Sequence, residues 1–237
     1  MEKGICIVSV APLRAESTHQ SEMVSQILYG ESVEILEANG SFSKVKTDFD
    51  QYEGWVDAKQ ISRISEEELS KRNTQIFTEV FGIKDLPEGH TLLSIGSEIQ
   101  GEDDQTLQAA TRENISQTAR LFLNVPYLWS GRSFFGIDCS GFSQLVYKVH
   151  GVSLPRNACH QAENGTVLDF IEESEPGDLA FFENEEGKIS HVGIMLEDQQ
   201  IIHAYGKVRI DTLDSSGIFN KDLGKHTHRL RFVKRIL

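Results

Sequence analysis

Cysteine is scarce in this chain, and the few cysteines are isolated from one another. The 237 residues contain only Cys6, Cys139 and Cys159, and no C-x-x-C pair occurs. An odd number of isolated cysteines excludes a disulfide framework and a zinc ribbon, and it is typical of a reducing compartment. If one of these thiols has a function, the expected chemistry is that of a single reactive sulfur.

Basic residues are also few. The chain has 23 Lys and Arg against 36 Asp and Glu, a formal net charge of −13 at pH 7. An acidic surface argues against binding to nucleic acid or to anionic lipid through bulk charge. We therefore expect no nucleic-acid partner and no membrane partner.

Long apolar runs are absent as well. No stretch approaches the ~20 consecutive apolar residues of a membrane-spanning helix. The first residues, "MEKGICIVSVAPLRAESTHQ", lack the unbroken apolar core of a signal peptide. Ile5–Val10 is predicted to form a strand instead. These absences predict a cytoplasmic protein.

What the chain does contain is a β-rich beginning. Residues 1–62 alternate apolar and polar side chains in short runs such as "ICIVSVAPLR", "FSKVKT" and "YEGWVDAKQI", separated by turn signals such as "ANGS". This period of two predicts a small β-barrel. Residues 63–110 are predicted to be a linker helix and a bridging segment, with part of a second barrel as an alternative.

The pattern changes from residue 111 onward. "TRENISQTARLFLNVPYLW" predicts a helix that is stopped by Pro126, and a second helical pattern begins at Cys139. Strand patterns follow to the end of the chain, in "DLAFFE", "SHVGIMLE", "QIIHAYG" and "HRLRFVKRIL". Helices followed by an antiparallel run of strands predict an α+β domain over residues 111–237.

Cys139 lies in "GIDCSGFSQLVY", at the predicted start of a helix. The free N–H groups and the dipole of a helix N-terminus stabilise negative charge, so we expect a lowered thiol pKa at this position. A thiol nucleophile also needs a neighbouring base and a group that orients the base.

Two histidines have the spacing that such a base requires. His191 and His203 lie 12 residues apart in consecutive predicted strands that are joined by the turn "EDQQ". Residues paired across adjacent antiparallel strands have Cβ atoms about 5 Å apart on one face. The spacing therefore predicts two imidazoles side by side. The "HTH" at residues 226–228 is interpreted as an exposed strand end, because no acid or cysteine lies at a useful spacing.

Together these motifs resemble a known family. The chain from residue 111 to 237 resembles an NlpC/P60 domain, a papain-like cysteine peptidase fold, and residues 1–62 resemble a bacterial SH3 (SH3b) domain. The matching pieces, in the order of that family, are "YLWSGRS", "DCSGFSQLVY", "LPRNACHQ", "PGDLAFF", "HVGIML" and "IIHAYG".

The resemblance implies a role for each matching residue. Cys139 would be the nucleophile, His191 the general base, and His203 the residue that orients His191. Tyr127 and the backbone N–H of Cys139 would stabilise the oxyanion. No metal and no cofactor are implied.

In relatives that carry an SH3b domain, the barrel covers the cleft and selects peptides with a free N-terminal L-alanine. The implied substrate contacts in this chain are Asp138, Ser140, Arg156, Tyr52 and Glu22, with the nearby Glu16 as an alternative to Glu22. Asp138 has a second interpretation as a helix N-cap, and both roles can hold together. In the loop after Arg156 the usual Asp or Ser is replaced by Asn157 and Ala158.

The implied function is a cytoplasmic γ-D-glutamyl-L-diamino acid endopeptidase that acts on murein tri- and tetrapeptides in peptidoglycan recycling. Two alternatives stay open at this point. One is a cell-wall-binding module without catalysis, and the other is a general wall hydrolase or amidase on the same scaffold.

Overall fold

The computed structural model describes residues 2–101 and 105–237. The chain divides into two compact units. Unit 1 comprises Met1–Leu107 and Trp129–Phe135, and unit 2 comprises Gln108–Leu128 and Gly136–Leu237. The chain therefore leaves unit 2 after Leu128, contributes seven residues to unit 1, and returns at Gly136.

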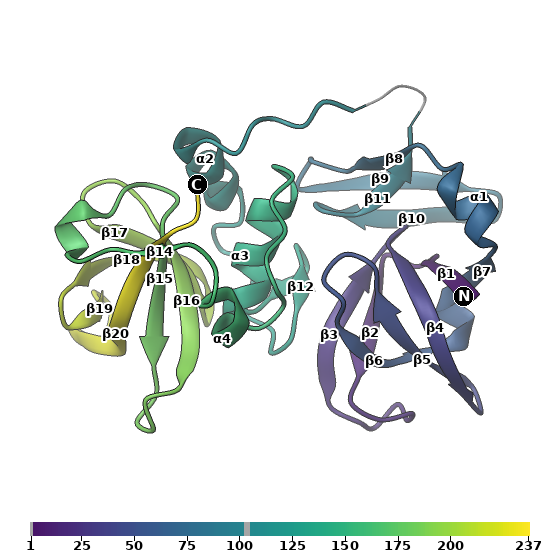
Figure 1. The fold of residues 1–237 in the computed structure, drawn as a ribbon, viewed down its shortest axis with the longest axis horizontal. Coiled ribbons are helices and arrows are strands. Elements are labelled where there is room, and N and C mark those ends of the chain that lie inside the picture. The colour runs from purple at the N-terminus through teal and green to yellow at the C-terminus, as the bar shows by residue number, and fades with distance from the viewer. Residues whose placement is uncertain (1, 102–104) are drawn as a thin grey trace. The chain divides into compact units, whose positions relative to one another are not determined.

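Unit 1 is built on a seven-stranded antiparallel sheet, the strongly curved purple and blue strands of Figure 1. The strands are β1 (Glu2–Cys6), β2 (Val10–Arg14), β3 (Met23–Leu28), β4 (Ser32–Asn39), β5 (Phe42–Thr47), β6 (Glu53–Asp57) and β7 (Ile61–Ile64), with the 3-10 helix η1 (Ala58–Gln60) before β7. Their order is β3-β2-β6-β5-β4-β1-β7. Alternate side chains such as Leu13, Ile27, Val45 and Val56 point into one apolar core.

The predicted strand Ile5–Val10 is wrong, because β1 ends at Cys6 and β2 begins only at Val10.

The segment predicted as a bridge belongs to unit 1 as far as Leu107. It starts with the short helix α1 (Glu66–Ser70), which begins at a capping box formed by Ser65 and Glu68. Two small two-stranded sheets follow. They pair β8 (Thr74–Ile76) with β11 (Glu98–Gln100), and β9 (Phe81–Leu86) with β10 (Gly89–Ser94).

The segment Trp129–Phe135 is held in unit 1 by a buried ion pair. Arg132, in β12 (Arg132–Ser133), donates two hydrogen bonds of 2.7 Å to the carboxylate of Glu31. Both side chains are almost fully buried. The indole N–H of Trp129 donates to Glu22 at 2.8 Å. Five of the seven residues of the motif "YLWSGRS" therefore belong to unit 1, anchored by Glu22 and Glu31 next to the strands of the SH3-like sheet.

Unit 2 has α2 (Arg112–Leu121), α3 (Cys139–Lys148) and α4 (Ala158–Gln161) beside a second antiparallel sheet. Its further elements are β13 (Gly136–Ile137), β14 (Thr166–Val167), η2 (Ile171–Glu173), β15 (Leu179–Glu183), β16 (Ile189–Met195), β17 (Gln200–Tyr205), β18 (Lys207–Asp214), β19 (Gly217–Asn220) and β20 (Lys225–Arg235). The sheet order is β14-β20-β15-β16-β17-β18-β19, and β20 also pairs with β19. The sheet therefore closes on itself, because β20, the last strand of the chain, pairs with β15 on one side and with β19 on the other.

The helices of unit 2 pack onto the middle of this sheet. α3 contacts both β16 and β17, and α2 contacts α3. Phe122 and Phe142 meet edge to face in that helical layer. The predicted helix over this stretch is present as α2, which begins after the N-cap Thr111, but it ends at Leu121, well before Pro126.

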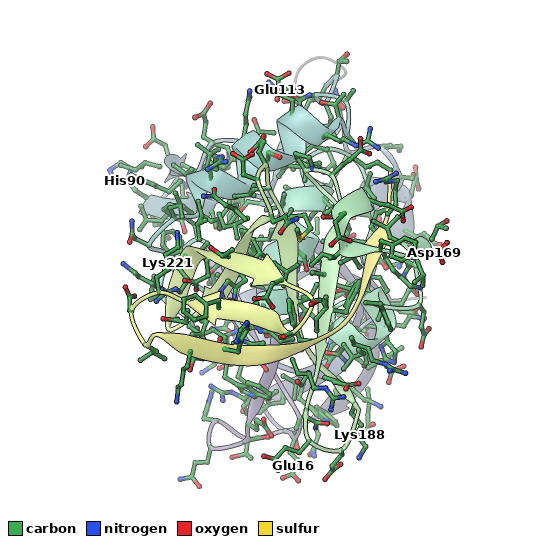
Figure 2. All side chains as sticks on the ribbon, turned by 90° about the vertical axis from the view of Figure 1, so that its left-hand side faces the viewer. Glu16, His90, Glu113, Asp169, Lys188 and Lys221 are labelled. Atoms are coloured by element: carbon green, nitrogen blue, oxygen red, sulfur yellow. The ribbon has the colours of Figure 1, made fainter. Side chains whose placement is uncertain are left out.

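Charged side chains cover the outside of the unit. Glu113, Asp169 and Lys188 point outward in Figure 2, and all three are exposed. No helix in the described parts of the chain is long and apolar enough to cross a membrane. The α+β fold class, with an SH3-like sheet before the helical and β domain, is confirmed.

Candidate active site

The N-terminus of α3 is held in place by a buried carboxylate. Asp138 is the N-cap, and its Oδ1 accepts a 2.6 Å hydrogen bond from the backbone N–H of Gly141. Arg156 donates to both oxygens of Asp138, at 3.0 and 2.7 Å, and to the hydroxyl of Ser140 at 3.0 Å. All of these side chains are buried. Cys139, the first residue of α3, is thus fixed on both sides.

The prediction of a lowered thiol pKa at Cys139 is wrong. Burial, with the neighbouring charge of Asp138, raises the pKa of the Cys139 thiol to about 12. Hydrogen bonds from the backbone at Val192 and Ser140, and the charge of Arg156, oppose this rise without cancelling it. The resting sulfur therefore carries its proton, and the site needs a base to remove it. The contact with Val192 places the sulfur beside the strand that carries His191.

His191 and His203 lie on adjacent antiparallel strands, as the spacing predicts. The expected direct pairing is replaced by a diagonal one. The register of β16 and β17 pairs Ile194 with Ile202, which puts Gly193 opposite His203 and His191 two residues away. A Cβ on Gly193 would lie 3.0 Å from the Cβ of His203, so a side chain at this position would press on the imidazole. The glycine leaves the two rings room to meet, and His191 Nε2 lies 2.9 Å from His203 Nδ1.

A third residue continues the chain of hydrogen bonds on β18. His203 Nε2 lies 3.1 Å from Oδ2 of Asp211, whose side chain is 1% exposed. Arg209 donates to both oxygens of Asp211, at 2.7 and 2.9 Å. Asp211 was not among the residues predicted from the sequence. Its spacing could have identified it, because Asp211 follows His203 by eight residues, which suits the next strand of an antiparallel sheet after one tight turn.

Asp211 sets the positions of the protons along this relay. Burial raises its pKa, but hydrogen bonds from His203 and Arg209 outweigh burial and lower the value to about 2. An ionised Asp211 accepts the Nε2 proton of His203, so His203 Nδ1 is an acceptor. His191 must then donate from Nε2, which leaves its Nδ1 unprotonated.

Both imidazoles are held neutral. Burial lowers the pKa of His191 well below its ordinary value, with the charge of His203 and then that of His228 adding to the effect. Burial also lowers the pKa of His203, although Asp211 opposes the shift. His191 therefore presents a free basic nitrogen at neutral pH.

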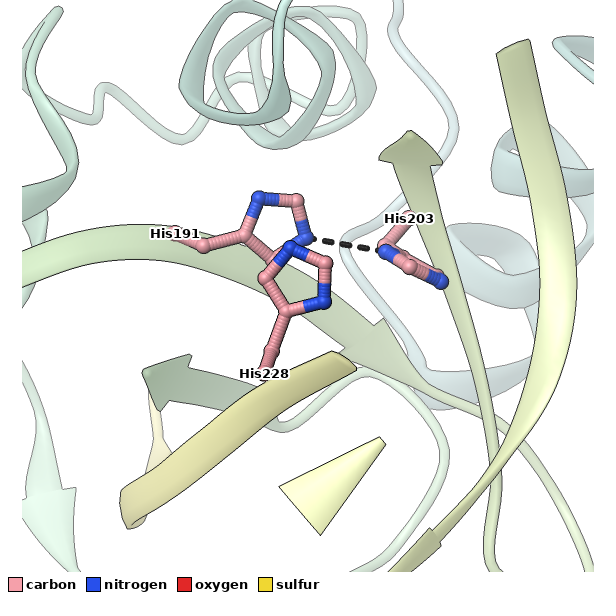
Figure 3. Close-up of side chains that lie close together, drawn as sticks. All are labelled: His191, His203 and His228. Atoms are coloured by element: carbon pink, nitrogen blue, oxygen red, sulfur yellow. Dashed lines mark hydrogen bonds between the residues drawn. The ribbon is translucent and has the colours of Figure 1, made fainter. Parts of the chain in front are cut away.

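His228 is not an exposed strand end, and that interpretation of "HTH" is wrong for this residue. Because the sheet closes, β20 brings the half-buried His228 ring onto His191, with ring centroids 4.1 Å apart and planes 23° apart. Figure 3 shows the three imidazoles grouped together. Burial lowers the pKa of His228 to about 4. His226 is exposed as expected, and it pairs with Asp214 at 2.8 Å.

A cavity of about 350 Å³ opens beside the relay. It is lined by Tyr127, Ser190, His191, Ala204, Tyr205, Gly206 and His228. Burial raises the pKa of Tyr127 to about 12, and the charges of Cys139 and Asp138 add to the rise. The Tyr127 hydroxyl is therefore a donor at every physiological pH, and Tyr127 lies near enough to Cys139 to interact with it electrostatically.

The other predicted contacts fall into two groups. Asp138, Ser140 and Arg156 form one buried hydrogen-bonded network next to Cys139. Glu22 and Tyr52 lie in unit 1, where Glu22 accepts from Trp129 and Tyr52 packs against the apolar core. Contact of any of the five with substrate stays a prediction.

Comparison with known proteins identifies both parts of the chain. Residues 124–227 match the NlpC/P60 family. Residues 13–61 match the family described as the bacterial dipeptidyl-peptidase Sh3 domain. The first match includes the cysteine, both histidines of the predicted triad and Asp211.

Several proteins are similar to the chain, among them two curated proteins and one solved structure. A gamma-D-glutamyl-L-lysine dipeptidyl-peptidase of Bacillus subtilis (strain 168) is 43% identical over 121 residues, which are 49% of this chain and 40% of that protein. Dipeptidyl-peptidase 6 of Lysinibacillus sphaericus is 28% identical over 93% of this chain and 95% of its own length. The crystal structure of an NlpC/P60 family protein from Bacillus cereus ATCC 10987 covers 99% of both chains, with 21% identity and a TM-score of 0.81, and shows the same fold.

Proposed function

Because this chain combines an NlpC/P60 domain with a bacterial SH3 domain, we propose that it is a cysteine peptidase for cell-wall peptides. The bond it cuts, in this proposal, joins γ-D-glutamate to an L-diamino acid in muropeptides. The name of the similar protein from B. subtilis, a gamma-D-glutamyl-L-lysine dipeptidyl-peptidase, supports this reaction. The name of the similar protein from L. sphaericus supports a dipeptidyl-peptidase without specifying the bond. The observation that carries the proposal is the relay from Asp211 through His203 to His191, together with the contact of the Cys139 sulfur with the backbone of Val192, the residue after His191.

Acylation follows from the proton positions in the relay. His191 Nδ1 takes the thiol proton while the sulfur of Cys139 attacks the γ-carbonyl carbon of the glutamyl residue. The imidazolium that forms donates from Nε2 to His203, whose other nitrogen donates to Asp211. The buried carboxylate of Asp211 stabilises the positive charge at the moment it appears. A raised thiol pKa is compatible with this step, because proton removal accompanies the attack.

Tyr127 and the helix start complete the reaction. The negative charge on the tetrahedral oxygen meets the backbone N–H of Cys139, which has no partner within the helix, and the Tyr127 hydroxyl. His191 then delivers its proton to the departing amine of the diamino acid, and the C–N bond breaks. Water, deprotonated by the same nitrogen, hydrolyses the thioester and releases L-Ala-γ-D-Glu.

In our proposal, the free amine of the substrate is bound near Asp138. An ammonium group that is removed from water requires a carboxylate partner. The pair of Asp138 with Arg156 places such a carboxylate next to the nucleophile, and Ser140 adds a hydroxyl. Glu22 and Tyr52 are the contacts that we propose from unit 1.

We place this activity in the cytoplasm, in the recycling of free muropeptides. The three unpaired cysteines support a reducing compartment. The relay argues against a module that only binds wall peptides, because binding needs no positioned base beside a thiol.

The test compares two substrates by mass spectrometry. One is the tripeptide L-Ala-γ-D-Glu-diaminopimelate, and the other is the same peptide with an acetylated alanine amine. The proposal predicts that wild type releases L-Ala-γ-D-Glu from the free tripeptide alone. Equal cleavage of both peptides would refute the proposal that the site recognises the free N-terminal amine. Absence of cleavage, or equal cleavage by Cys139→Ala, would refute the peptidase itself.

A further inference from the structure

A third imidazole stands at the active site without a part in the proposed reaction. One nitrogen from each of His191, His203 and His228 lies within 4.8 Å of the other two. Figure 3 shows His228 reaching the pair from a different strand. Hydrolysis as described above uses only His191 and His203, so the presence of a third, half-buried ring calls for another explanation.

We propose that these three histidines bind a divalent transition-metal ion, with zinc as the preferred ion, and that the bound ion switches the peptidase off. The inhibition, though not the binding, rests on the proposed function. Three imidazoles suit Zn²⁺ better than Mg²⁺ or Ca²⁺, which require oxygen ligands. Three protein ligands with a fourth position left open are a common arrangement around zinc.

Two of the three rings already have the outer hydrogen bonds that metal ligands show. Histidines that bind a metal usually hold their second nitrogen against a carboxylate or another acceptor, which fixes the tautomer. His203 has Asp211 at 3.1 Å from Nε2, so its Nδ1 is the ligand atom. His228 has the Thr227 hydroxyl at 2.9 Å from Nδ1, which leaves Nε2 as its ligand atom.

Metal binding requires the rings to rearrange, because the His228 ring is stacked on His191 with planes 23° apart and must turn so that its nitrogen faces the ion. A zinc–nitrogen bond of about 2.0–2.1 Å places two ligand nitrogens roughly 3.3 Å apart in a tetrahedron. His191 Nε2 and His203 Nδ1 lie 2.9 Å apart, so this pair must widen slightly. His228 must close in from within 4.8 Å, and its half-buried side chain lines the cavity.

Charge around the cluster favours a cation. Asp211 lies behind His203, and Arg209, its partner, is shared with Asp222 at 2.8 Å. One guanidinium facing two carboxylates leaves this group with a net negative charge. The ion would therefore enter a site whose nearest fixed charges attract it.

Inhibition follows from the single proton of a neutral imidazole. A metal on Nε2 of His191 displaces the proton from that nitrogen, and the proton moves to Nδ1. No proton is lost overall, but Nδ1 can no longer accept the proton of Cys139. The same ion also breaks the hydrogen bond that His191 donates to His203.

The binding test is titration of the metal-free full-length chain with zinc chloride in a calorimeter. We expect one ion per chain. His228→Phe, which keeps a stacking ring, should weaken binding by more than the ~100-fold that outer-shell partners contribute. Asp211→Asn should weaken it about 10- to 100-fold. The matched control is His226→Asn, which removes the exposed histidine of the same motif and should bind zinc as wild type does.

Circular dichroism melting of each variant shows whether it folds, and His228→Asn replaces the phenylalanine variant if that one melts early. A second readout is the visible spectrum of Co²⁺, which we expect to show four-coordinate absorption bands in wild type only. Unchanged zinc binding in a folded His228 variant would place the ion elsewhere and overturn the proposal, as would absence of binding to wild type.

The activity test adds zinc to the peptidase assay and then a chelator. We expect zinc to inhibit wild type and His226→Asn, the chelator to restore turnover, and inhibition to shift to higher zinc concentrations in His228→Phe, measured against its own zinc-free rate. Cleavage without zinc binding would refute the metal site alone. Zinc binding without any cleavage would refute the peptidase while leaving the metal site standing.

Discussion

Two thiols, one in each unit, have nearly the same burial and the same pKa. Cys6 in unit 1 is 0% exposed and Cys139 in unit 2 is 8% exposed. Burial raises the pKa of each to about 12. Cys6 is surrounded by core side chains and donates weakly to the carbonyls of Val8 and Ile27. Cys139 instead lies beside a strand that carries a neutral imidazole. In the proposed reaction, the reactivity of Cys139 therefore comes from the neighbouring base and not from a lowered thiol pKa.

The largest expected effect is the loss of the proposed nucleophile, the thiol of Cys139. Cys139→Ala should reduce hydrolysis of the tripeptide by at least ~10⁴-fold, because no other group can form the thioester. Cys6→Ala should keep the wild-type rate and lower the free energy of unfolding by about 1 kcal/mol, the effect of a small cavity. Product release and urea unfolding measure the two quantities. A strong loss of activity in folded Cys6→Ala would contradict the distinction between a core thiol at Cys6 and a nucleophile at Cys139.

The next largest effect is expected at the far end of the relay. Asp211→Asn can donate an amide N–H to His203 Nε2, which reverses the protons of both histidines and puts one on His191 Nδ1. We expect kcat to fall on the order of 10²-fold, the usual contribution of a general base. The control is Asp214→Asn, which alters the exposed pair with His226 on the same strand. Similar rates for Asp211→Asn and Asp214→Asn would show that the relay ends at His203.

The smallest effect is a slope in the pH dependence of stability, and it should be the same for both thiols. Above a pH of about 8.5 the unfolded chain loses its thiol protons, while the folded chain holds them up to about 12. The folded state then binds more protons, so stability falls as the pH rises, by up to about 1.4 kcal/mol per pH unit for each thiol.

Removing either thiol should make this fall less steep by a similar amount. Urea unfolding of wild type, Cys6→Ala and Cys139→Ala from pH 8 to pH 10 measures the slopes. If only Cys6→Ala changes the slope, the thiol of Cys139 is already ionised in the folded protein, and the proton order in the relay must be revised.

Local features of the sequence predicted the core of the site. The small residues around Cys139 and the acid before it predicted the helix start and its cap, and the spacing of His191 and His203 predicted neighbouring strands. These features depend on residues close in the chain or on one hairpin. The diagonal register depends on Gly193, whose missing side chain makes room for His203.

The missed features depend on contacts between distant strands or on burial. His228 reaches His191 from β20, which pairs with both β15 and β19, and no local pattern in the sequence predicts these pairings. The raised pKa of Cys139 results from burial and from Asp138, which outweigh the helix N-terminus. The prediction of a strand over Ile5–Val10 was wrong because a run of apolar residues does not show where the backbone turns between two strands.

The most direct test of the central claim is the rate at which iodoacetamide alkylates each cysteine of the folded protein, followed by peptide mass spectrometry. The exposed Cys159 provides the reference for an unassisted thiol. The account predicts that Cys139 reacts together with the loss of activity, that His191→Ala slows this reaction, and that Cys6 stays unmodified. If Cys139 is as unreactive as Cys6, or if His191→Ala leaves its rate unchanged, the neighbouring imidazole does not activate the thiol and the account is wrong.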